Sequence, residues 1–351
     1  MIIHHYYPHG HNIGDRFARD GIRKLLRERS PGATIVDFPV NKSCPPGVAY
    51  GLRGENVERN NAEADLVVIG GSNLYQCRKR GPWGVATDVE SIQRLSRPVM
   101  LIGLGTGSSF KNTVRPCLPP SSDEIRLLNQ RAVGSSVRDK RTEAFLTALG
   151  LRGQVMTGCP STFVFEKDLA FNDHLDVAVS FPPVRFKKRH PWTYFRVIRA
   201  IRKHMDYCLG QGLRPFLACH DRGDLELAKE ISRGRTELFF SENTEDYYAR
   251  YANIRLLVGF RLHASIICLS MGVPFIPVSF DLRGTAFLEA YDSIDWGLDG
   301  TSWRLGKDLI GRTRQILARQ SGPFEKLFAC RRQYAGVIRQ FVAGCLAKAG
   351  A

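Results

Sequence analysis

The chain has 351 residues, enough for two domains of ordinary size, and its 43% hydrophobic and 24% charged residues exclude a disordered or fibrous protein. Fifty Lys and Arg against 34 Asp and Glu give a formal net charge of +16, which favours acidic partners. These include nucleic acid, an anionic membrane surface, phosphorylated small molecules and acidic glycans, and the alternative is a basic surface that serves only solubility.

Short apolar and β-branched runs recur through the first half of the chain and predict buried strands. They are MIIHHYY, ATIVDF, DLVVIGG, PVMLIGLG, AVGSSVR and QVMTG. Helical patterns lie between them, as in residues 15–27 and 139–149, each beginning near an acidic residue that suits a helix N-terminus. This alternation predicts a mostly parallel sheet, in a Rossmann-like domain over residues 1–165.

A second series of strands begins near Leu175 and predicts a second Rossmann-like domain over residues 175–304. Its strands are DVAVSF, RPFLACH, TELFFS, RLLVGF and VPFIPVS. The segment between the two series has no strong pattern and is the predicted boundary. Residues 305–351 are helical and basic, so they form either a surface that approaches an anionic membrane or a solvated face packed on the domain.

The nine cysteines are widely spaced and contain no Cys-x-x-Cys pair, which predicts reduced thiols in a cytosolic protein. The N-terminal segment MIIHHYYPHG lacks the pattern of a signal peptide, and no apolar run is long enough to span a membrane. We therefore expect a cytoplasmic protein whose only membrane contact is peripheral, at the inner membrane.

Ligands of parallel α/β sheets bind beyond the carboxyl ends of the strands, so functional residues are expected at the strand-to-loop junctions. The glycine-rich junctions let backbone N–H groups approach phosphate or carboxylate oxygens, although glycines that serve only tight turns are the alternative. Their spacing does not match the G-x-G-x-x-G pattern of a dinucleotide site. The predicted substrate contacts at these junctions are Asn12, Gly14, Asp15, Gly70, Gly71, Ser72, Asn73, Gly105 and Thr106.

Two side chains at other junctions are candidates for chemistry. Arg138 ends a predicted strand, and its planar guanidinium suits bidentate binding of a carboxylate or phosphate; a salt bridge with Asp139 is the alternative. His263 follows the strand RLLVGF at the start of an apolar helix, and its pKa range suits proton transfer at neutral pH. A purely structural histidine is the other interpretation.

Four further histidines gather near the N-terminus. They are His4, His5, His9 and His11. Their spacing matches no structural zinc pattern and no paired cysteines accompany them, so we predict no metal site.

Together the junction motifs resemble the polysaccharide pyruvyl transferase family, which adds ketal-linked pyruvate to bacterial glycans. The matching segments stand in the family's order between Asn12 and about Asp281. They are NIGD, ADLVVIGGSNL, GLGTG, SVRDKRTEAFLTALGL, VMTGCP and VGFRLHASIICLSMGVPFIPVSFD. The resemblance implies a GT-B-like fold, two Rossmann-like domains facing a cleft, with phosphoenolpyruvate as donor and no metal or organic cofactor. It also implies a glycan or lipid-linked oligosaccharide as acceptor, and no nucleic acid partner.

The resemblance also implies roles for particular residues. The Arg of the family's V-R-D motif corresponds to Arg138 and the His of R-L-H-A to His263, which would protonate the donor, stabilise the departing phosphate, or do both. Many members carry a Lys where this chain has Arg283, so we assign Arg283, with Arg261, to holding phosphate or carboxylate. Acceptor binding is the part of the assignment with least support, with Arg185 near the expected position.

Two other functions stay open from the sequence. A nucleotide-sugar glycosyltransferase on a similar scaffold would need an acidic residue to bind a ribose, which Glu242, Glu245 or Asp246 can supply. A non-catalytic basic scaffold on a membrane or acidic polymer would have no donor pocket.

Overall fold

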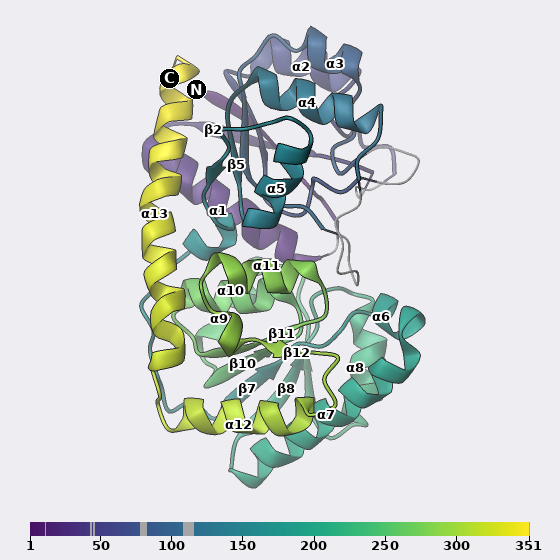
Figure 1. Ribbon diagram of the computed structural model, residues 1–351, viewed down its shortest axis with the longest axis vertical. Helices are drawn as coiled ribbons and strands as arrows, with labels where there is room; N and C mark the ends of the chain where they lie inside the picture. Colours follow the sequence, from purple (N-terminus) through teal and green to yellow (C-terminus); the bar gives the residue numbers. More distant parts are fainter. Residues whose placement is uncertain (11, 43, 45, 78–82, 108–115, 351) are drawn as a thin grey trace. The chain divides into compact units, whose positions relative to one another are not determined.

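The computed structural model describes residues 1–10, 12–42, 44, 46–77, 83–107 and 116–350. The chain divides into two compact units (Figure 1). Unit 1 consists of Met1–Gly10, Asp15–Val164 and Arg331–Ala351, and unit 2 consists of His11–Gly14 and Phe165–Cys330. Each unit is built on one six-stranded parallel sheet, which confirms the predicted α/β class with two Rossmann-like units.

Unit 1 carries a sheet in the order β2-β1-β3-β4-β5-β6. Its strands are β1 (Ile2–Tyr7), β2 (Thr34–Pro39), β3 (Leu66–Gly70), β4 (Val99–Leu104), β5 (Ala132–Val137) and β6 (Val155–Met156). Its helices are α1 (Ile13–Arg29), which begins in the short stretch assigned to unit 2, α2 (Glu55–Glu63), α3 (Val89–Arg94), α4 (Ser121–Arg131) and α5 (Lys140–Ala148), with a 3₁₀ turn at Pro160–Phe163. The strand order reverses between β1 and β3, which is where ligands of such sheets bind.

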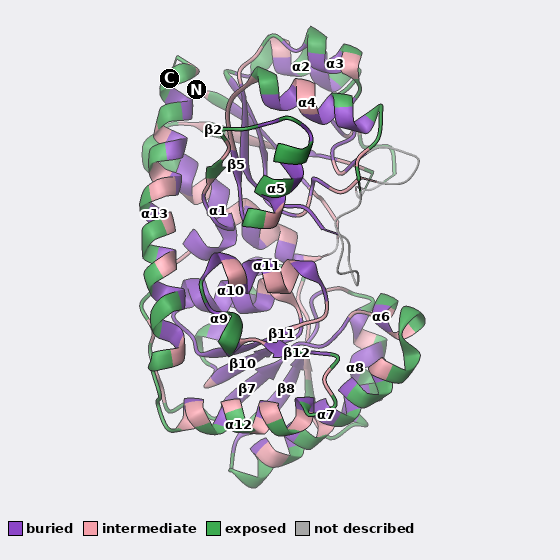
Figure 2. Cartoon of the chain, in the orientation of Figure 1, coloured by how far each residue is buried: buried purple, intermediate pink, exposed green. Residues whose placement is uncertain are grey.

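Both faces of this sheet are buried, as expected for a parallel sheet covered by helices. In β3, Val67 and Ile69 contribute to one hydrophobic cluster, whereas Leu66 and Val68 contribute to the other. Successive side chains of a strand point to opposite faces, so a continuous apolar run such as LVVIG serves both clusters. The central strands β1, β3 and β4 are drawn almost entirely as buried in Figure 2.

Unit 2 carries a sheet in the order β12-β11-β10-β7-β8-β9, the Rossmann order with its reversal between β7 and β10. Its strands are β7 (Asp176–Val179), β8 (Arg214–Ala218), β9 (Glu237–Phe239), β10 (Leu256–Gly259), β11 (Phe275–Ser279) and β12 (Leu298–Asp299). Its helices are α6 (Val184–Arg189), α7 (Pro191–Gly210), α8 (Asp224–Ser232), α9 (Thr244–Ala252), α10 (Leu262–Met271), α11 (Leu282–Ala290) and α12 (Leu305–Leu317), with a 3₁₀ turn at Ile294–Trp296.

The predicted separate segment 305–351 is instead divided between the units. Helix α12 packs against α7 in unit 2, and the last helix, α13 (Gly322–Lys348), contributes residues to both units. Its apolar side chains enter a core cluster of unit 1: Ala335, Ile338, Phe341, Val342, Cys345 and Leu346. Since these side chains are already buried, α13 has no continuous apolar face left for a membrane.

The prediction of reduced thiols was wrong for two cysteines, because Cys77 and Cys117 form a disulfide across 40 residues of sequence. Motif spacing does not detect such a pair, since only the fold brings the two side chains together. The other seven cysteines are free. No helix in the described part of the chain is long and apolar enough to cross a membrane.

Candidate functional site

The turn after β3 requires glycine at the reversal of the first sheet. Gly71 and Ser72 both have left-handed backbone, with φ of 70° and 60°. A Cβ added to Gly71 would stand 2.6 Å from the Cβ of Ala18 in α1, so the turn fits closely against that helix. The Ser72 hydroxyl donates to the carboxylate of Asp15. The predicted residues 70–72 and Asp15 therefore meet in unit 1.

Arg138 lies directly beyond β5 and is 94% buried, with only 6% of its surface exposed. Its Nε donates to Asp139 Oδ2 over 3.3 Å, and its Nη2 donates to Asn73 Oδ1 over 3.1 Å. A guanidinium has five N–H donors, so three of them have no partner among the described residues. The salt bridge with Asp139 foreseen as the alternative exists, but it uses only one donor.

The two carboxylate oxygens of Asp139 have different partners. Oδ2 accepts from Arg138, and Oδ1 accepts from the first turn of α5. Its Oδ1 accepts from the backbone N–H and the hydroxyl of Thr142, at 2.8 Å each, and so caps α5. The backbone N–H of Thr106 in turn donates to the Thr142 hydroxyl over 2.9 Å. The Asp139 carboxylate is therefore only partly available to neutralise Arg138.

The glycine turn after β4 makes room for this guanidinium. A Cβ added to Gly105 would stand 2.1 Å from Arg138 Nε, closer than any real contact. Thr106 is fixed by its hydroxyl, which donates to the carbonyl of Tyr75 over 2.7 Å. The structure thus brings the predicted residues Asn73, Gly105, Thr106 and Arg138 together in one cluster of unit 1.

In unit 2 the segment after β10 lies at the reversal of the second sheet, and Arg261 is anchored there. Its backbone N–H donates to Ser180 Oγ (3.1 Å), just beyond β7, and its Nε donates to the carbonyl of Phe181 (3.1 Å). Its Nη2 binds the buried carboxylate of Asp224 at the start of α8. Burial raises the pKa of Asp224, and the charge of Arg261 opposes that rise.

His263 occupies the second position of α10, directly beyond this strand. A Cβ added to Gly14 would stand 2.3 Å from its Nδ1, so the glycine of the predicted NIGD junction leaves space for the imidazole. Asn12 supports the same turn, because its side-chain oxygen accepts from the N–H of Gly14 over 3.2 Å. Within unit 2, His263 therefore lies beside the turn of Asn12 and Gly14.

A second histidine of this region, His220, was missed from the sequence. It is buried, shares a 2.8 Å hydrogen bond with the Tyr251 hydroxyl, and its backbone N–H donates to Asp224 over 3.0 Å. Burial, followed by the nearby charges of Arg261 and His263, holds the pKa of His220 well below its usual value. The signal was its place at the end of the predicted strand RPFLACH.

Arg283 and the N-terminal histidines have other partners. The Arg283 guanidinium binds both oxygens of Asp281, the residue that caps α11, with Nη2 to Oδ2 at 2.7 Å. His4 hydrogen-bonds Asn60 over 2.8 Å, and His5 lies 3.6 Å from the Asp37 carboxylate. His11 lies outside the described residues. Among those described, no group of three His, Cys, Asp or Glu side chains could hold a metal ion.

Comparison with known families gives one match over most of the chain. The family model described as polysaccharide pyruvyl transferase matches residues 12–281, the range that holds all the junctions above. No curated protein sequence matches the chain significantly.

Solved structures resemble the whole chain in fold at low sequence identity. The UDP-N-acetylglucosamine 2-epimerase from Rickettsia bellii has a TM-score of 0.57 at 10% identity, covering 100% of this chain and 97% of that one. A UDP-N-acetylglucosamine 2-epimerase from Listeria monocytogenes has 0.56 at 14%, covering 98% and 93%. The Neisseria meningitidis UDP-GlcNAc 2-epimerase bound to UDP-GlcNAc has 0.53 at 10%, covering 99% and 100%. These similarities confirm the predicted GT-B-like fold with two Rossmann-like domains.

Proposed function

The chain belongs to the polysaccharide pyruvyl transferase family, and from that premise we propose that it transfers pyruvate from phosphoenolpyruvate to a sugar, forming a ketal. The acceptor in this proposal is a glycan or a lipid-linked oligosaccharide. The reaction needs cations for two anionic groups, a proton donor and a route for phosphate to leave. No metal or organic cofactor takes part in it.

The observation that carries the donor assignment is the buried guanidinium of Arg138. It stands at a strand end with three N–H donors that have no partner among the described residues. A buried charge left only partly paired is costly, and an anionic ligand would offset that cost. Phosphoenolpyruvate carries a carboxylate and a phosphate, and the fork of Arg138 suits either one.

His263 is the proposed proton donor. In the proposed step the imidazolium gives a proton to C3 of phosphoenolpyruvate while a sugar hydroxyl forms a bond to C2. The C2–O bond to phosphate then breaks, phosphate departs, and a second sugar hydroxyl closes the ketal on C2. Of the two hydroxyl protons, one restores the imidazolium and the other leaves with phosphate. His263 in its charged form would also stabilise the departing phosphate.

Arg261 and Arg283 stay proposed as contacts for phosphate or carboxylate. Their expected contribution to donor binding is smaller than that of Arg138. Each already has a carboxylate partner, Asp224 for Arg261 and Asp281 for Arg283. A ligand anion would have to share the guanidinium with that carboxylate. The glycine-rich turns stay proposed as further contacts, but the backbone N–H groups of Gly71, Gly105 and Thr106 already donate to Ile102, Ser72 and Thr142.

The proposed compartment is the cytoplasm. The Cys77–Cys117 disulfide does not favour it, because disulfides are uncommon in reducing compartments. Fractionation of cells that express the chain, with thiol labelling of Cys77 and Cys117, tests this part of the proposal.

The experiment that tests the function is a comparison of melting temperatures with different donors. A ligand that binds only the native state stabilises it by RT ln(1 + [L]/Kd). We expect millimolar phosphoenolpyruvate to raise the melting temperature and pyruvate to raise it much less. If phosphoenolpyruvate has no effect while UDP or GDP stabilises the protein, the nucleotide-sugar glycosyltransferase replaces this proposal. If no donor stabilises it, the non-catalytic scaffold gains support.

A further inference from the structure

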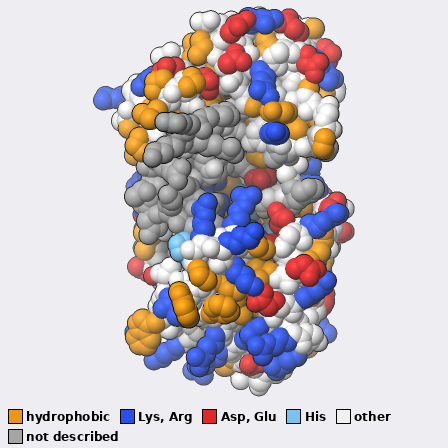
Figure 3. Space-filling view, turned by 90° about the vertical axis from the view of Figure 1, so that its right-hand side faces the viewer, with side chains coloured by type: hydrophobic (Ala, Val, Ile, Leu, Met, Phe, Trp, Pro, Cys, Tyr) orange, Lys and Arg blue, Asp and Glu red, His pale blue; other side chains and the backbone are white. Residues whose placement is uncertain are grey.

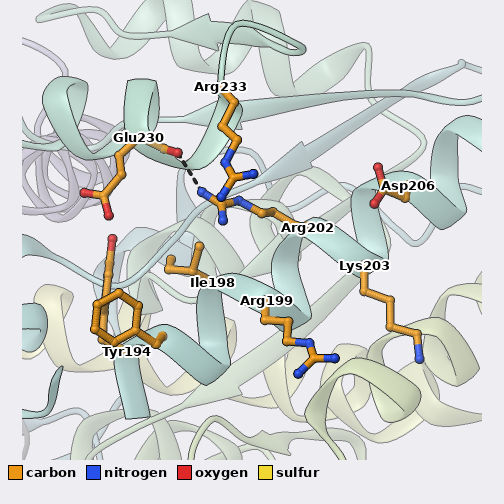
Figure 4. Close-up of a pocket in the computed structure, with 9 residues that line it drawn as sticks. Tyr194, Ile198, Arg199, Arg202, Lys203, Asp206, Glu230 and Arg233 are labelled. Atoms are coloured by element: carbon orange, nitrogen blue, oxygen red, sulfur yellow. Dashed lines mark hydrogen bonds between the residues drawn. The ribbon is translucent and has the colours of Figure 1, made fainter. Parts of the chain in front are cut away.

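A cavity lies in unit 2, in a different place from the strand ends that carry Arg261 and His263. Its volume is about 640 Å³. It lies between α7 and the C-terminal end of α8, where Arg233 follows the helix (Figure 4). Its walls are Tyr194, Phe195, Ile198, Arg199, Arg202, Lys203, Asp206, Glu230 and Arg233.

The charges around this cavity do not balance. Its two carboxylates are already paired with cations outside the wall, Asp206 with Arg235 at 3.3 Å and Glu230 with Lys187 at 2.6 Å. Its four cations have no carboxylate partner in the part of the chain that the structure describes: Arg199, Arg202, Lys203 and Arg233. The cavity therefore presents a surplus of positive charge.

Arg202 is held in position without being neutralised. Its Nη2 donates to the carbonyl of Glu230 over 2.7 Å and its Nε to the carbonyl of Ile231 over 3.2 Å. Burial, followed by the repulsion of Arg233, lowers the pKa of Arg202. An anion between these two guanidinium groups would relieve that repulsion.

A buried hydroxyl adds a neutral donor to the same cavity. The Tyr194 side chain is fully buried, and its hydroxyl has no hydrogen-bond partner among the described residues. In Figure 4 it points into the space beside Glu230. Burial raises the pKa of Tyr194, so the phenol keeps its proton and is available as a donor. Several cations with a hydroxyl donor suit a phosphate group, which offers several acceptor oxygens.

The surface next to the cavity is aromatic as well as basic. Trp192 is 84% exposed, Phe195 is 59% exposed, and Trp303 is 84% exposed. Trp192, Phe195 and Arg199 follow one another at helical spacing on one face of α7. The loop that holds Trp303 is tied to α7, because Arg196 donates to the carbonyl of Thr301 over 2.7 Å.

Exposed basic residues surround these aromatic rings. They are Arg185, Lys188, Arg189, Arg196, Arg199 and Lys203. Figure 3 shows Lys and Arg side chains gathered around exposed hydrophobic side chains over α6 and α7. Aromatic rings among basic side chains are typical of surfaces that lie at the headgroup level of an anionic membrane. An aqueous phosphate ligand would not require the rings to be exposed.

We propose that the cavity between α7 and α8 binds the phosphate of an anionic phospholipid headgroup, with Trp192, Phe195 and Trp303 at the membrane interface. This surface replaces residues 305–351 as the membrane contact, since the apolar side chains of α13 are buried. The proposal is independent of the reaction that the chain catalyses. The positive charge of the cavity suits a phosphate group. The exposed aromatic rings beside it favour a phosphate that belongs to a lipid over a soluble phosphate.

The test is sedimentation of the full chain with vesicles of phosphatidylcholine alone or with added phosphatidylglycerol. We expect binding only to the second kind, and a loss of about tenfold in affinity for the double variant Arg199→Gln with Lys203→Gln, since each basic residue near such a surface contributes to binding. The matched control is Arg222→Gln with Lys229→Gln, two exposed cations of the same unit that already pair with Glu242 and Glu226. That control should bind nearly as well as the parent.

Two further variants distinguish specific binding in the cavity from the general attraction of a basic surface to anionic vesicles. Tyr194→Phe removes only the buried hydroxyl and should weaken vesicle binding several-fold at unchanged melting temperature. Trp192→Ala with Trp303→Ala should weaken it without any change in net charge. Equal losses in the double variant and its charge-matched control would overturn the proposal. The proposal would also be overturned if glycerol 3-phosphate saturated the cavity at the same phosphate concentration at which vesicles bind. The ligand would then be a soluble phosphate and not a lipid.

Discussion

The arginines that follow strand ends in the two units differ in their partners. Arg138 in unit 1 is only 6% exposed, and it shares the carboxylate of Asp139 with the N-terminus of α5 and binds the amide oxygen of Asn73. Arg261 in unit 2 binds a buried carboxylate and a backbone carbonyl, and Arg283 binds both oxygens of Asp281. A basic residue at a strand end is therefore a stronger candidate for a ligand contact where it is more buried and its carboxylate partner is shared with other donors.

The largest effect is expected at His263, which the proposal makes the proton donor. His263→Gln keeps the size of the side chain and some hydrogen bonding but cannot cycle a proton. Turnover should fall by about 10² to 10⁴-fold, with the melting temperature and phosphoenolpyruvate binding nearly unchanged. The matched control is His174→Gln at an exposed position of the same unit. A His263→Gln variant that still transfers pyruvate within a few-fold of the parent rate would make His263 a structural residue.

Replacement of Arg261 tests whether an arginine that is paired with a buried carboxylate stabilises the fold. Arg261→Gln leaves the Asp224 carboxylate buried without its cation, and the pKa of Asp224 then rises further. A carboxyl whose folded pKa is raised favours the folded state at low pH and loses that advantage as pH rises. The variant should therefore lose about 3 kcal/mol of stability at pH 8 and less at pH 5, measured by urea unfolding.

An exposed pair of the same unit is the control for that experiment. Arg222 and Glu242 are 69% and 50% exposed, so Arg222→Gln should cost about 1 kcal/mol or less at either pH. If Arg261→Gln is no more destabilising than Arg222→Gln, the buried pair does not anchor the segment before His263.

Gly105 tests whether the glycine turn serves Arg138. Gly105→Ala would place a Cβ 2.1 Å from Arg138 Nε, so the guanidinium must move. We expect the dissociation constant of phosphoenolpyruvate to rise by about tenfold, because positioned charge-assisted hydrogen bonds are lost. Gly336→Ala in α13, where a Cβ meets nothing within 4 Å, should leave donor binding unchanged. Unchanged affinity in Gly105→Ala would reduce this turn to a structural role.

The sequence was informative wherever a residue type follows a strand, because parallel strands end at one edge of a sheet. Residues 70–73, Gly105 and Arg138 were predicted at strand ends, and the structure brings them together in unit 1. The partner of Arg261 was missed, since Asp224 lies far from it in sequence and only the packing of α8 brings it close. The partner of Arg283 is the nearby Asp281, which was not recognised as the N-cap of α11. His220 was missed for a related reason: a histidine at the end of an apolar run was taken as part of the strand.

The two errors of prediction outside the site also concern contacts between distant residues. Spacing alone could not indicate that Cys77 and Cys117 meet. The C-terminal helix α13 was predicted as a separate basic segment because its charges are evident in the sequence, whereas its burial depends on the sheet of unit 1. Local pattern predicts elements and their ends, but not which elements pack together.

The most direct test of the account is the phosphoenolpyruvate affinity of Arg138→Lys and Arg283→Lys, measured by isothermal titration calorimetry on variants with parental melting temperatures. Lysine keeps the charge and loses the fork, so the change isolates bidentate recognition. We predict that Arg138→Lys weakens donor binding by about tenfold, and that Arg283→Lys weakens it less because Asp281 already occupies that guanidinium. An unchanged affinity in Arg138→Lys, or a greater loss in Arg283→Lys, would contradict the account.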